Sequence, residues 1–338
     1  ACANLPLDSE TNFFCSTQMA GVAPLYSLPA DPIPTALQFP PEMRQTQYEN
    51  GTWSERFDSQ SVVNTNQAFS VGAWWLTMVV IGLVAWPILF TAFPALADRG
   101  YGLAKFGGLV FIAWVPYVLA SARLPAWSQL GVLGALIAMA LISGWLAWRQ
   151  RAALWDYLKA NAVKLFWIEL LTWLLFAFYL AIRLTNPDLW HNVYGGEKPM
   201  DFAYFNGVLR STVFPPVDPW YAGGYINYYF YGYVTVGAPV LLLKMVPSIA
   251  YNLIIPTIFA VIGVGTFSVA FNLVSALRDR TAHSVQDEQS KPAPRLGNPW
   301  VAGIAALLLT GVFGNLDTPR VFLSEALLPA GYFNNPTG

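Results

Sequence analysis

Long stretches without any charged residue constrain this chain more than any other feature. No Asp, Glu, Lys or Arg occurs in six windows of the sequence, which are 71–97, 106–122, 124–148, 219–243, 245–277 and 296–316. A seventh window, 165–182, contains only Glu169. A helix needs about 20 mostly apolar residues to cross the hydrocarbon core of a bilayer. The windows therefore predict an all-α integral membrane protein.

We predict about seven transmembrane helices, near residues 72–95, 103–122, 126–148, 163–183, 226–246, 250–275 and 298–316. The alternative is that these are buried helices of a large soluble protein. Soluble chains rarely contain so many uncharged windows, so this alternative is disfavoured. Pro87, Pro116, Pro239 and Pro256 fall inside the predicted spans. Membrane bundles tolerate such prolines because neighbouring helices satisfy the freed carbonyl groups.

The composition excludes several classes of protein. Hydrophobic residues make up 55 % of the chain and charged residues 11 %, whereas a soluble domain carries about 25 % charge. This balance excludes a soluble globular enzyme and a disordered chain. The net charge of -1 provides no basic field for a nucleic-acid partner. Two histidines and two cysteines exclude a multi-histidine metal site and a disulfide-rich scaffold.

The distribution of polar residues predicts three regions. Residues 1–70 are rich in acidic and uncharged polar residues and form an N-terminal segment. Residues 71–162 form a three-helix transmembrane region, and 163–338 form a core region that contains the loop 184–225. The chain has no initiator Met and no early apolar run after a basic start. We therefore expect an internal piece of a longer protein or a processed product.

Basic residues in short loops predict the orientation in the cell membrane. The connection 149–164 contains Arg149, Arg151, Lys159 and Lys164, which places it in the cytoplasm. The N-terminal segment and the loop 184–225 are then external. This topology also places the loop 277–297 outside, although its basic residues favour the cytoplasmic side. Its acidic residues reduce the positive charge of the loop but do not cancel it.

Two cysteines lie in the predicted external segment. Cys2 and Cys15 would be in an oxidising compartment, where a disulfide and free thiols are both open alternatives.

The predicted external loop 184–225 combines acidic, basic and aromatic side chains. Pro199 suits the first position of a helix, so Met200 to Ser211 is predicted to form a short helix along the membrane surface. Asp201 falls in its first turn, where the helix dipole favours a carboxylate. Glu197 lies four residues earlier, and the two acids can converge on one point above the membrane.

Basic and aromatic side chains surround these acids in the sequence. Lys198 and Arg210 bracket them and are suited to binding a phosphate. The predicted substrate-binding residues are Lys198, Arg210, Arg183, Asp218, Trp220, Asn227, Tyr228 and Tyr229. The structural alternative is an interfacial helix capped by its acids, with the tyrosines in an aromatic belt. His191 and Glu169 are weaker candidates for a functional role.

Several motifs resemble a known family of membrane proteins. They are Gly196-Glu-Lys-Pro-Met-Asp201, Leu209-Arg-Ser211, Phe214-Pro-Pro216, Asp218-Pro-Trp220, Ile226-Asn-Tyr-Tyr229, Gly51-Thr-Trp-Ser-Glu-Arg-Phe57, Asn64-Thr-Asn66, Trp74-Trp75 and Asp98-Arg-Gly-Tyr101. Together they resemble the uncharacterised bacterial and archaeal "YYY" family of very hydrophobic membrane proteins, from about residue 50 to 275.

That family is similar to the multispan glycosyltransferases of the GT-C fold, which use polyprenyl-phosphate sugars. The resemblance implies a GT-C-like core in which the span 163–183 is the first core helix and 184–225 the catalytic loop. Asp201 is then the leading candidate for the catalytic base, and Glu197 the second. The implied reaction moves a sugar to an acceptor hydroxyl with inversion at the anomeric carbon.

The implied partners are membrane lipids and a polyprenyl-phosphate sugar, whose isoprenoid would lie in a groove between helices. Arg210, Lys198 or Arg183 would neutralise the phosphate of the leaving group. No cofactor is required, and a divalent metal held by Glu197 and Asp201 stays open. The alternative is a non-catalytic structural or accessory subunit that binds other membrane subunits, so enzyme activity is left undecided.

Overall fold

The computed structural model describes residues 38–47, 49, 51–189, 197–285 and 297–314. Within 197–285, side chains are described up to residue 278. The chain divides into two units, Ala1–Gln38 and Phe39–Gly338, and the fold described below is that of the second. Within the described residues the regular structure is helical and no strand is present. The predicted all-α class is therefore confirmed.

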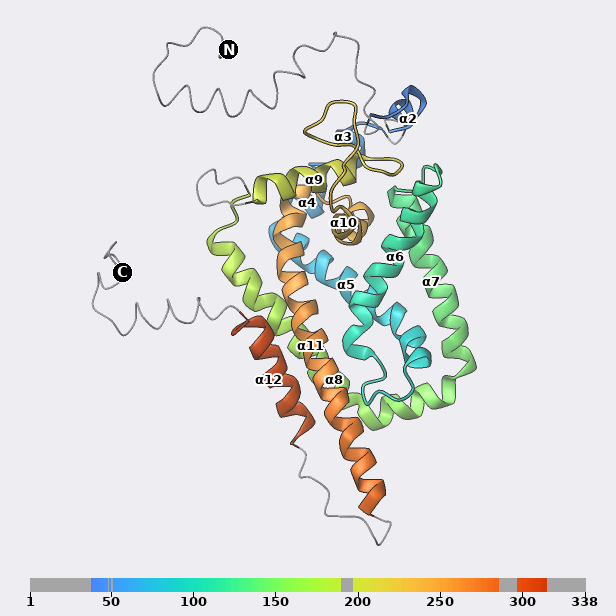
Figure 1. Ribbon diagram of the computed structural model, residues 1–338, viewed down its shortest axis with the longest axis vertical. Coiled ribbons are helices and arrows are strands. Elements are labelled where there is room, and N and C mark those ends of the chain that lie inside the picture. Colours follow the sequence, from blue (N-terminus) through green and yellow to red (C-terminus); the bar gives the residue numbers. More distant parts are fainter. Residues whose placement is uncertain (1–37, 48, 50, 190–196, 286–296, 315–338) are drawn as a thin grey trace, which may run out of the picture. The chain divides into compact units, whose positions relative to one another are not determined.

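Twelve helical elements follow one another in the described part of the second unit (Figure 1). They are α2 (Pro41–Thr46), α3 (Trp53–Arg56), α4 (Val62–Thr65), α5 (Gln67–Ala92), η2 (Tyr101–Leu103), α6 (Ala104–Ser121), α7 (Gln129–Arg149), α8 (Arg151–Thr185), α9 (Lys198–Arg210), α10 (Tyr231–Leu243), α11 (Pro247–Val285) and α12 (Pro299–Gly311).

Five segments are long and apolar enough to cross a membrane. They are 67–92, 101–121, 129–149, 151–185 and 247–278. Helices α10 and α12 occupy the two remaining predicted positions, but each has only 13 residues. At about 1.5 Å per residue such a helix covers about 20 Å, less than the hydrocarbon core. The protein is thus a multi-pass membrane protein, and a total of seven spans stays a prediction.

Two predicted boundaries differ from the structure. The connection expected at 149–164 is helical, because α7 ends at Arg149 and α8 begins at Arg151. Residues 151–164 are rich in Ala, Leu and Lys, which are strong helix formers. In addition, the polar segment expected at 1–70 contains α2, α3, α4 and the start of α5.

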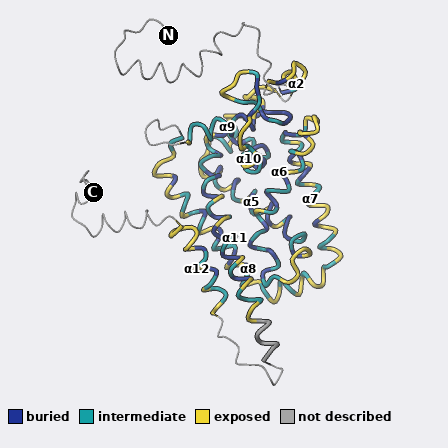
Figure 2. The backbone as a smooth tube through the Cα atoms, in the orientation of Figure 1, coloured by how far each residue is buried: buried dark blue, intermediate teal, exposed yellow. Residues whose placement is uncertain are grey.

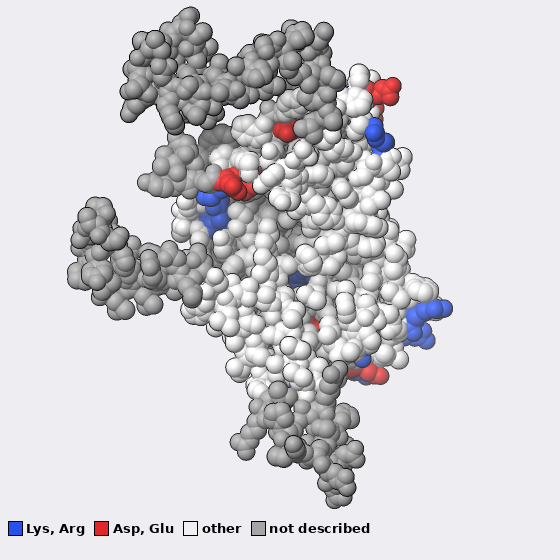
Figure 3. Space-filling view, in the orientation of Figure 1, with Lys and Arg blue, Asp and Glu red and all other residues white. Residues whose placement is uncertain are grey.

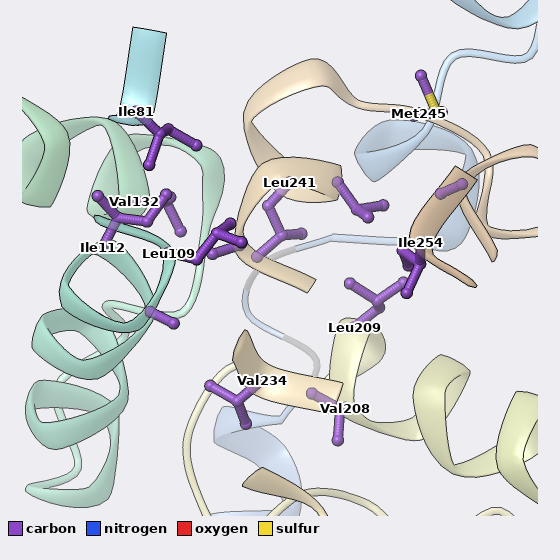
Figure 4. Packing of buried hydrophobic residues seen from close by; sticks show 14 of the residues in the cluster. Ile81, Leu109, Ile112, Val132, Val208, Leu209, Val234, Leu241, Met245 and Ile254 are labelled. Carbon is purple, nitrogen blue, oxygen red and sulfur yellow. The ribbon is translucent and has the colours of Figure 1, made fainter. Parts of the chain in front are cut away.

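One large cluster of buried apolar side chains joins α5, α6, α7, α9, α10 and α11. In Figure 4, Leu109, Ile112 and Val132 lie across from Leu241 and Val234 of α10, with Val208 and Leu209 of α9 next to them. Helices on both sides of the predicted boundary at 162/163 therefore share this cluster. Exposed apolar side chains instead follow the outer faces of α7 and α8 (Figure 2), where lipid would cover them.

A buried carboxylate organises the turn between α5 and α6. Asp98 is fully buried, and its oxygens accept hydrogen bonds from the N–H groups of Gly100 and Gly102 at 2.9 and 3.1 Å. Ser268 Oγ and Asn272 Nδ2 of α11 donate to the same carboxylate at 2.7 and 2.8 Å. The motif Asp98-Arg-Gly-Tyr101 therefore has a structural role, because it fastens η2 to α11.

Gly102 allows the close approach of η2 and α11 in this turn. A β-carbon at position 102 would lie 2.7 Å from the Cβ of Ser268, closer than two carbon atoms can pack.

An ion pair lies between the apolar faces of α6 and α8. Lys105 Nζ donates to Glu169 Oε2 at 2.5 Å, and the hydroxyl of Tyr101 donates to the same oxygen at 3.2 Å. The side chains of Lys105 and Glu169 are 11 % and 28 % exposed. Glu169 therefore has a structural partner, which favours the structural role for this intramembrane acid over a functional one.

Replacing only Lys105 with methionine should destabilise the protein by about 2–3 kcal/mol, because Glu169 is then left without its cation. The double variant Lys105→Met/Glu169→Leu should return to within about 1 kcal/mol of the parent, since two apolar side chains need no partner. Unfolding of the detergent-solubilised protein by sodium dodecyl sulfate measures both values. A double variant as unstable as the single one would show that the pair itself contributes the stability.

Candidate functional site

Helix α9 positions the acidic side chains of the loop 184–225. It runs from Lys198 to Arg210 with Pro199 in its first turn, within two residues of the predicted helix. Phe205, Val208 and Leu209 are buried against the bundle, and Trp127 Nε1 donates to the carbonyl oxygen of Val208 at 2.9 Å. This packing fixes the rotation of α9 and therefore the direction in which Asp201 points.

Asp201 lies beside a cluster of aromatic side chains. Its Oδ1 accepts a hydrogen bond from the hydroxyl of Tyr233, the third residue of α10, at 2.6 Å. The ring of Tyr251, near the start of α11, packs against Phe202 and Phe205 with centroids 5.5 and 6.0 Å apart. Asp201 itself is half-buried. Three helices thus converge on one partly desolvated carboxylate.

A buried cation lies close to the same cluster. Arg183, in the last turn of α8, is 8 % exposed, and its Nε donates to Asn252 Oδ1 at 3.0 Å. Nη2 of the same guanidinium also donates to that oxygen. Asn252 directly follows Tyr251, whose ring packs on Phe202, the residue next to Asp201. The end of α8 therefore brings a positive charge into the neighbourhood of the carboxylate.

Glu197 directly precedes α9 and is exposed. Its carbonyl oxygen accepts the N–H of Asp201 at 2.9 Å, so the two acids are four residues apart and face the same side of the helix. The described residues contain no group of three or more His, Cys, Asp or Glu side chains that could hold a metal ion. A metal held by Glu197 and Asp201 stays a prediction.

Arg210 lies on the opposite side of α9 from Asp201. Nine residues separate them, and at about 100° per residue they point in opposite directions. Arg210 and Asp218 instead line a cavity of about 790 Å³ together with Arg44 of α2. The structure therefore places Arg210 on another face of α9 than Asp201, and its predicted role in binding a phosphate stays a prediction.

The predicted substrate-binding residues at the end of the loop 184–225 and just after it are exposed. Trp220, Tyr228 and Tyr229 are 62, 50 and 82 % exposed, and Asn227 is also exposed. Tyr228 contacts the ring of Tyr204 of α9, with centroids 5.8 Å apart. Their predicted role in substrate binding is not tested by this geometry.

Asp218 has a local role in the turn that it begins. Its Oδ1 accepts hydrogen bonds from the N–H groups of Trp220 and Tyr221 at 2.7 and 3.1 Å.

Several site residues were not found from the sequence. They are Tyr233, Tyr251 and Asn252, which lie near Asp201 or Arg183. In the sequence, the only signal for them is that each lies near the start of an apolar helix. Residues 190–196 are not described, so His191 lies outside the described residues, as do Cys2 and Cys15.

Comparison with known proteins identifies the family. No curated protein and no solved structure matches the chain. One family model matches residues 111–335, which include α7 to α12 and the whole of the loop that carries Asp201. The resemblance to very hydrophobic membrane proteins is confirmed at this level. The chain belongs to the family described as "Uncharacterized membrane protein (DUF2298)".

Proposed function

We propose that the protein is a membrane glycosyltransferase that moves a sugar from a polyprenyl-phosphate donor to an acceptor hydroxyl, with inversion at the anomeric carbon. The observation that carries the proposal is the position of Asp201. Its carboxylate lies on helix α9 and accepts a hydrogen bond from Tyr233. The buried cation Arg183 binds Asn252, which follows the Tyr251 that packs on Phe202 of the same helix.

Asp201 is proposed as the general base. An acceptor hydroxyl is a poor nucleophile at neutral pH, and a carboxylate within hydrogen-bond reach accepts its proton as the new bond to the sugar forms. The hydrogen bond from Tyr233 occupies Oδ1 and leaves Oδ2 for the acceptor. Glu197, on the same side of α9, is the second candidate.

Arg183 is proposed to stabilise the leaving group. When the bond between the sugar and the phosphate breaks, the polyprenyl phosphate gains negative charge, and a preoriented cation in a partly desolvated site stabilises it. Asn252 holds the guanidinium through one oxygen, so its other N–H groups remain available to a phosphate. Lys198, at the start of α9, is a second cation near the acids.

An apolar groove on the same helices fits the isoprenoid chain. A cavity of about 780 Å³ lies between α6, α10, α11 and α12, and its lining on α11 extends from Thr257 to Leu273. The distance along the helix axis from Thr257 to Leu273 is about 24 Å, most of the hydrocarbon core. Leu109, Val261 and Ala306 are among the lining residues, and the groove thus offers the apolar surface that such a chain needs.

The distribution of charge supports an external site. Near the end of the bundle opposite α9 lie Arg149, Arg151, Lys159 and Lys164 (at the α7–α8 junction and on α8), which the positive-inside rule assigns to the cytoplasm. Figure 3 shows few charged side chains on the white middle of the bundle. With α10 and α12 completing seven membrane helices, α8 and the loop after it would form a GT-C-like core.

Asp201→Asn should lower sugar transfer at least about 100-fold, because the amide cannot accept the proton. The assay uses purified protein in nanodiscs, with radiolabelled undecaprenyl-phosphate glucose and decaprenyl-phosphate mannose as donors and a membrane extract as acceptor. Tyr233→Phe should lower kcat about tenfold with little change in KM, since the base loses its orientation but the donor site is kept.

Asp156→Asn is the matched control, because Asp156 is exposed on α8 and 3.0 Å from Lys159, far from α9 in the sequence. It should transfer sugar at the parent rate. Full activity of Asp201→Asn would exclude this residue as the base. Absence of transfer from either donor by the parent protein, with other membrane proteins covering α9, would favour the structural or accessory subunit.

A further inference from the structure

A small polar cavity lies where α3, the first turn of α7 and the end of α10 meet. Its volume is about 290 Å³, at the lower end of the usual range for small-molecule sites. None of its lining residues belongs to the proposed catalytic site. The cavity therefore suits one small polar group rather than a whole substrate molecule.

Arg56 places a buried cation at the wall of this cavity. The residue is 8 % exposed, and its two terminal nitrogens donate hydrogen bonds to the segment 209–212. Its Nε is enclosed and has no hydrogen-bond partner in the described part of the chain. Buried donors are nearly always paired, so an unpaired donor beside a cavity indicates an acceptor that a ligand supplies.

Lys244 is a second cation at the cavity. It ends α10 with a φ of +49°, a left-handed conformation that is unfavourable for residues other than glycine. Asn64 fixes this turn, because its Nδ2 donates to the carbonyl oxygen of Lys244 at 3.0 Å and its Oδ1 accepts the N–H of Val246 at 2.7 Å. The motif Asn64-Thr-Asn66 thus positions the lysine.

The ammonium group of Lys244 keeps donors for a ligand. Among the residues that the structure describes, Nζ donates only to the carbonyl oxygen of Glu55, at 3.5 Å, and forms no ion pair. An ammonium group has three N–H donors. Its charge is therefore not neutralised by the described side chains.

The first turn of α7 adds backbone donors to the same cavity. Ser128 Oγ accepts the N–H of Gly131 at 3.2 Å. The N–H groups of Gln129 and Leu130 have no acceptor within the helix, because these residues begin it. Both residues line the cavity. Such free N–H groups and the helix dipole together bind phosphates.

The charges of the lining favour an anion. Glu55 is the single carboxylate among the lining residues, and its Oε2 accepts hydrogen bonds from the N–H and the hydroxyl of Thr52 at 2.5 and 2.8 Å. Arg56 and Lys244 carry two positive charges, and the start of α7 adds a partial one. The lining thus has an excess of positive charge that an anionic group would balance.

An exposed apolar face of α7 begins at this cavity. Leu130 lines the cavity and is 77 % exposed, and Leu133, Ile137 and Leu141 are also exposed. Spacings of three and four residues place these side chains on one face of the helix. An acyl chain that lies along this face would bring its headgroup to the cavity.

We propose that the cavity between α3, α7 and α10 binds the phosphate group of an anionic membrane lipid. The phosphate oxygens accept hydrogen bonds from the start of α7, from Lys244 Nζ and from Arg56 Nε, and an acyl chain lies along α7. The proposal does not depend on the proposed glycosyl transfer, because the two sites share no residue.

Native mass spectrometry of the full chain, released from detergent micelles, tests the site with three probes: dioleoyl phosphatidate, dioleoylglycerol and inorganic phosphate. Phosphatidate should bind at least about tenfold more tightly than dioleoylglycerol, which has the same acyl chains but no phosphate. Inorganic phosphate at the same concentration should not displace the phosphatidate, because it has no apolar chain to bury along α7.

Two variants locate the binding site. Lys244→Asn should weaken phosphatidate binding about tenfold, because a charge-assisted hydrogen bond is lost, and asparagine tolerates the left-handed conformation. Leu130→Glu should weaken it at least about tenfold, because the new carboxylate repels the phosphate. An acid in the first turn suits the helix dipole and Leu130 is exposed, so this variant should keep the melting temperature of the parent.

Lys159→Asn is the matched control, because it removes a lysine that is exposed on α8 and outside the cavity. It should bind phosphatidate like the parent. The proposal is overturned if dioleoylglycerol binds as tightly as phosphatidate, if inorganic phosphate displaces the lipid, or if either folded variant binds phosphatidate like the parent. Leu130→Glu alone decides the result if Lys244→Asn does not fold.

Discussion

Replacing Asp98 with alanine should lower the free energy of unfolding by about 3–5 kcal/mol. The carboxylate receives hydrogen bonds from Gly100, Gly102, Ser268 and Asn272. These hydrogen bonds are buried together with the carboxylate. A buried donor that loses its acceptor lowers the free energy of unfolding by about 1–3 kcal/mol. The turn between α5 and α6 would then lose its attachment to α11.

Asp98→Asn should have a smaller effect, about 2 kcal/mol. Asparagine has the same size as aspartate and keeps one acceptor oxygen. Its NH2 group, however, replaces the second oxygen and faces a hydrogen-bond donor instead of accepting from it. Thermal unfolding in detergent, followed by tryptophan fluorescence, measures both variants. Asp156→Ala, an exposed acid on α8, should stay within about 0.5 kcal/mol of the parent. If Asp98→Ala and Asp156→Ala unfold at the same temperature, the buried hydrogen-bond network does not stabilise the fold.

Replacing Arg56 with alanine should destabilise the docking of the N-terminal segment by about 3–4 kcal/mol. Arg56 Nη1 donates to the carbonyl oxygens of Leu209 and Ser211 at 2.6 and 3.2 Å, and Nη2 donates to Thr212 Oγ1 at 3.1 Å. These acceptors lie at the end of α9, where a positive charge also complements the helix dipole. Alanine would leave the acceptors unpaired and a void beside them.

Burial of Arg56 opposes part of this stabilisation. Burial, and secondly the positive charge of Arg210, lower the pKa of Arg56 to about 10. The guanidinium is still protonated at neutral pH, so the hydrogen bonds must offset the cost of removing it from water. Arg56→Lys should therefore retain only part of the stability, because one ammonium group cannot reach all three acceptors.

Hydrogen–deuterium exchange locates the effect of Arg56→Ala. The amides of 209–217 should exchange at least about tenfold faster than in the parent protein, while those of α7 should be unchanged. Gln47 should protect part of this segment even in the variant, because it accepts the N–H of Thr212 at 2.8 Å and donates to Val213 O at 2.9 Å. Unchanged exchange over 209–217 would show that Arg56 does not hold the loop.

The candidate site illustrates how far sequence patterns reach. The surface helix was predicted to within two residues, because Pro199 and the first-turn acid Asp201 act locally. The pairing of Asp201 with Tyr233 was not predicted, since the two residues are 32 positions apart. Their contact depends on how α9 and α10 pack, and spacing along the chain does not encode that packing.

The sequence by itself determined that this protein is a multi-pass helical membrane protein with a polar loop between α8 and α10. Uncharged windows and a helix-starting proline act through solvation and local backbone geometry, so neither needs the rest of the fold. Only the tertiary structure decided that Tyr233 pairs with Asp201 and that Arg56 packs onto the end of α9. Arg56 and Leu209 are 153 residues apart, and the packing of buried side chains, rather than any local pattern, brings them together.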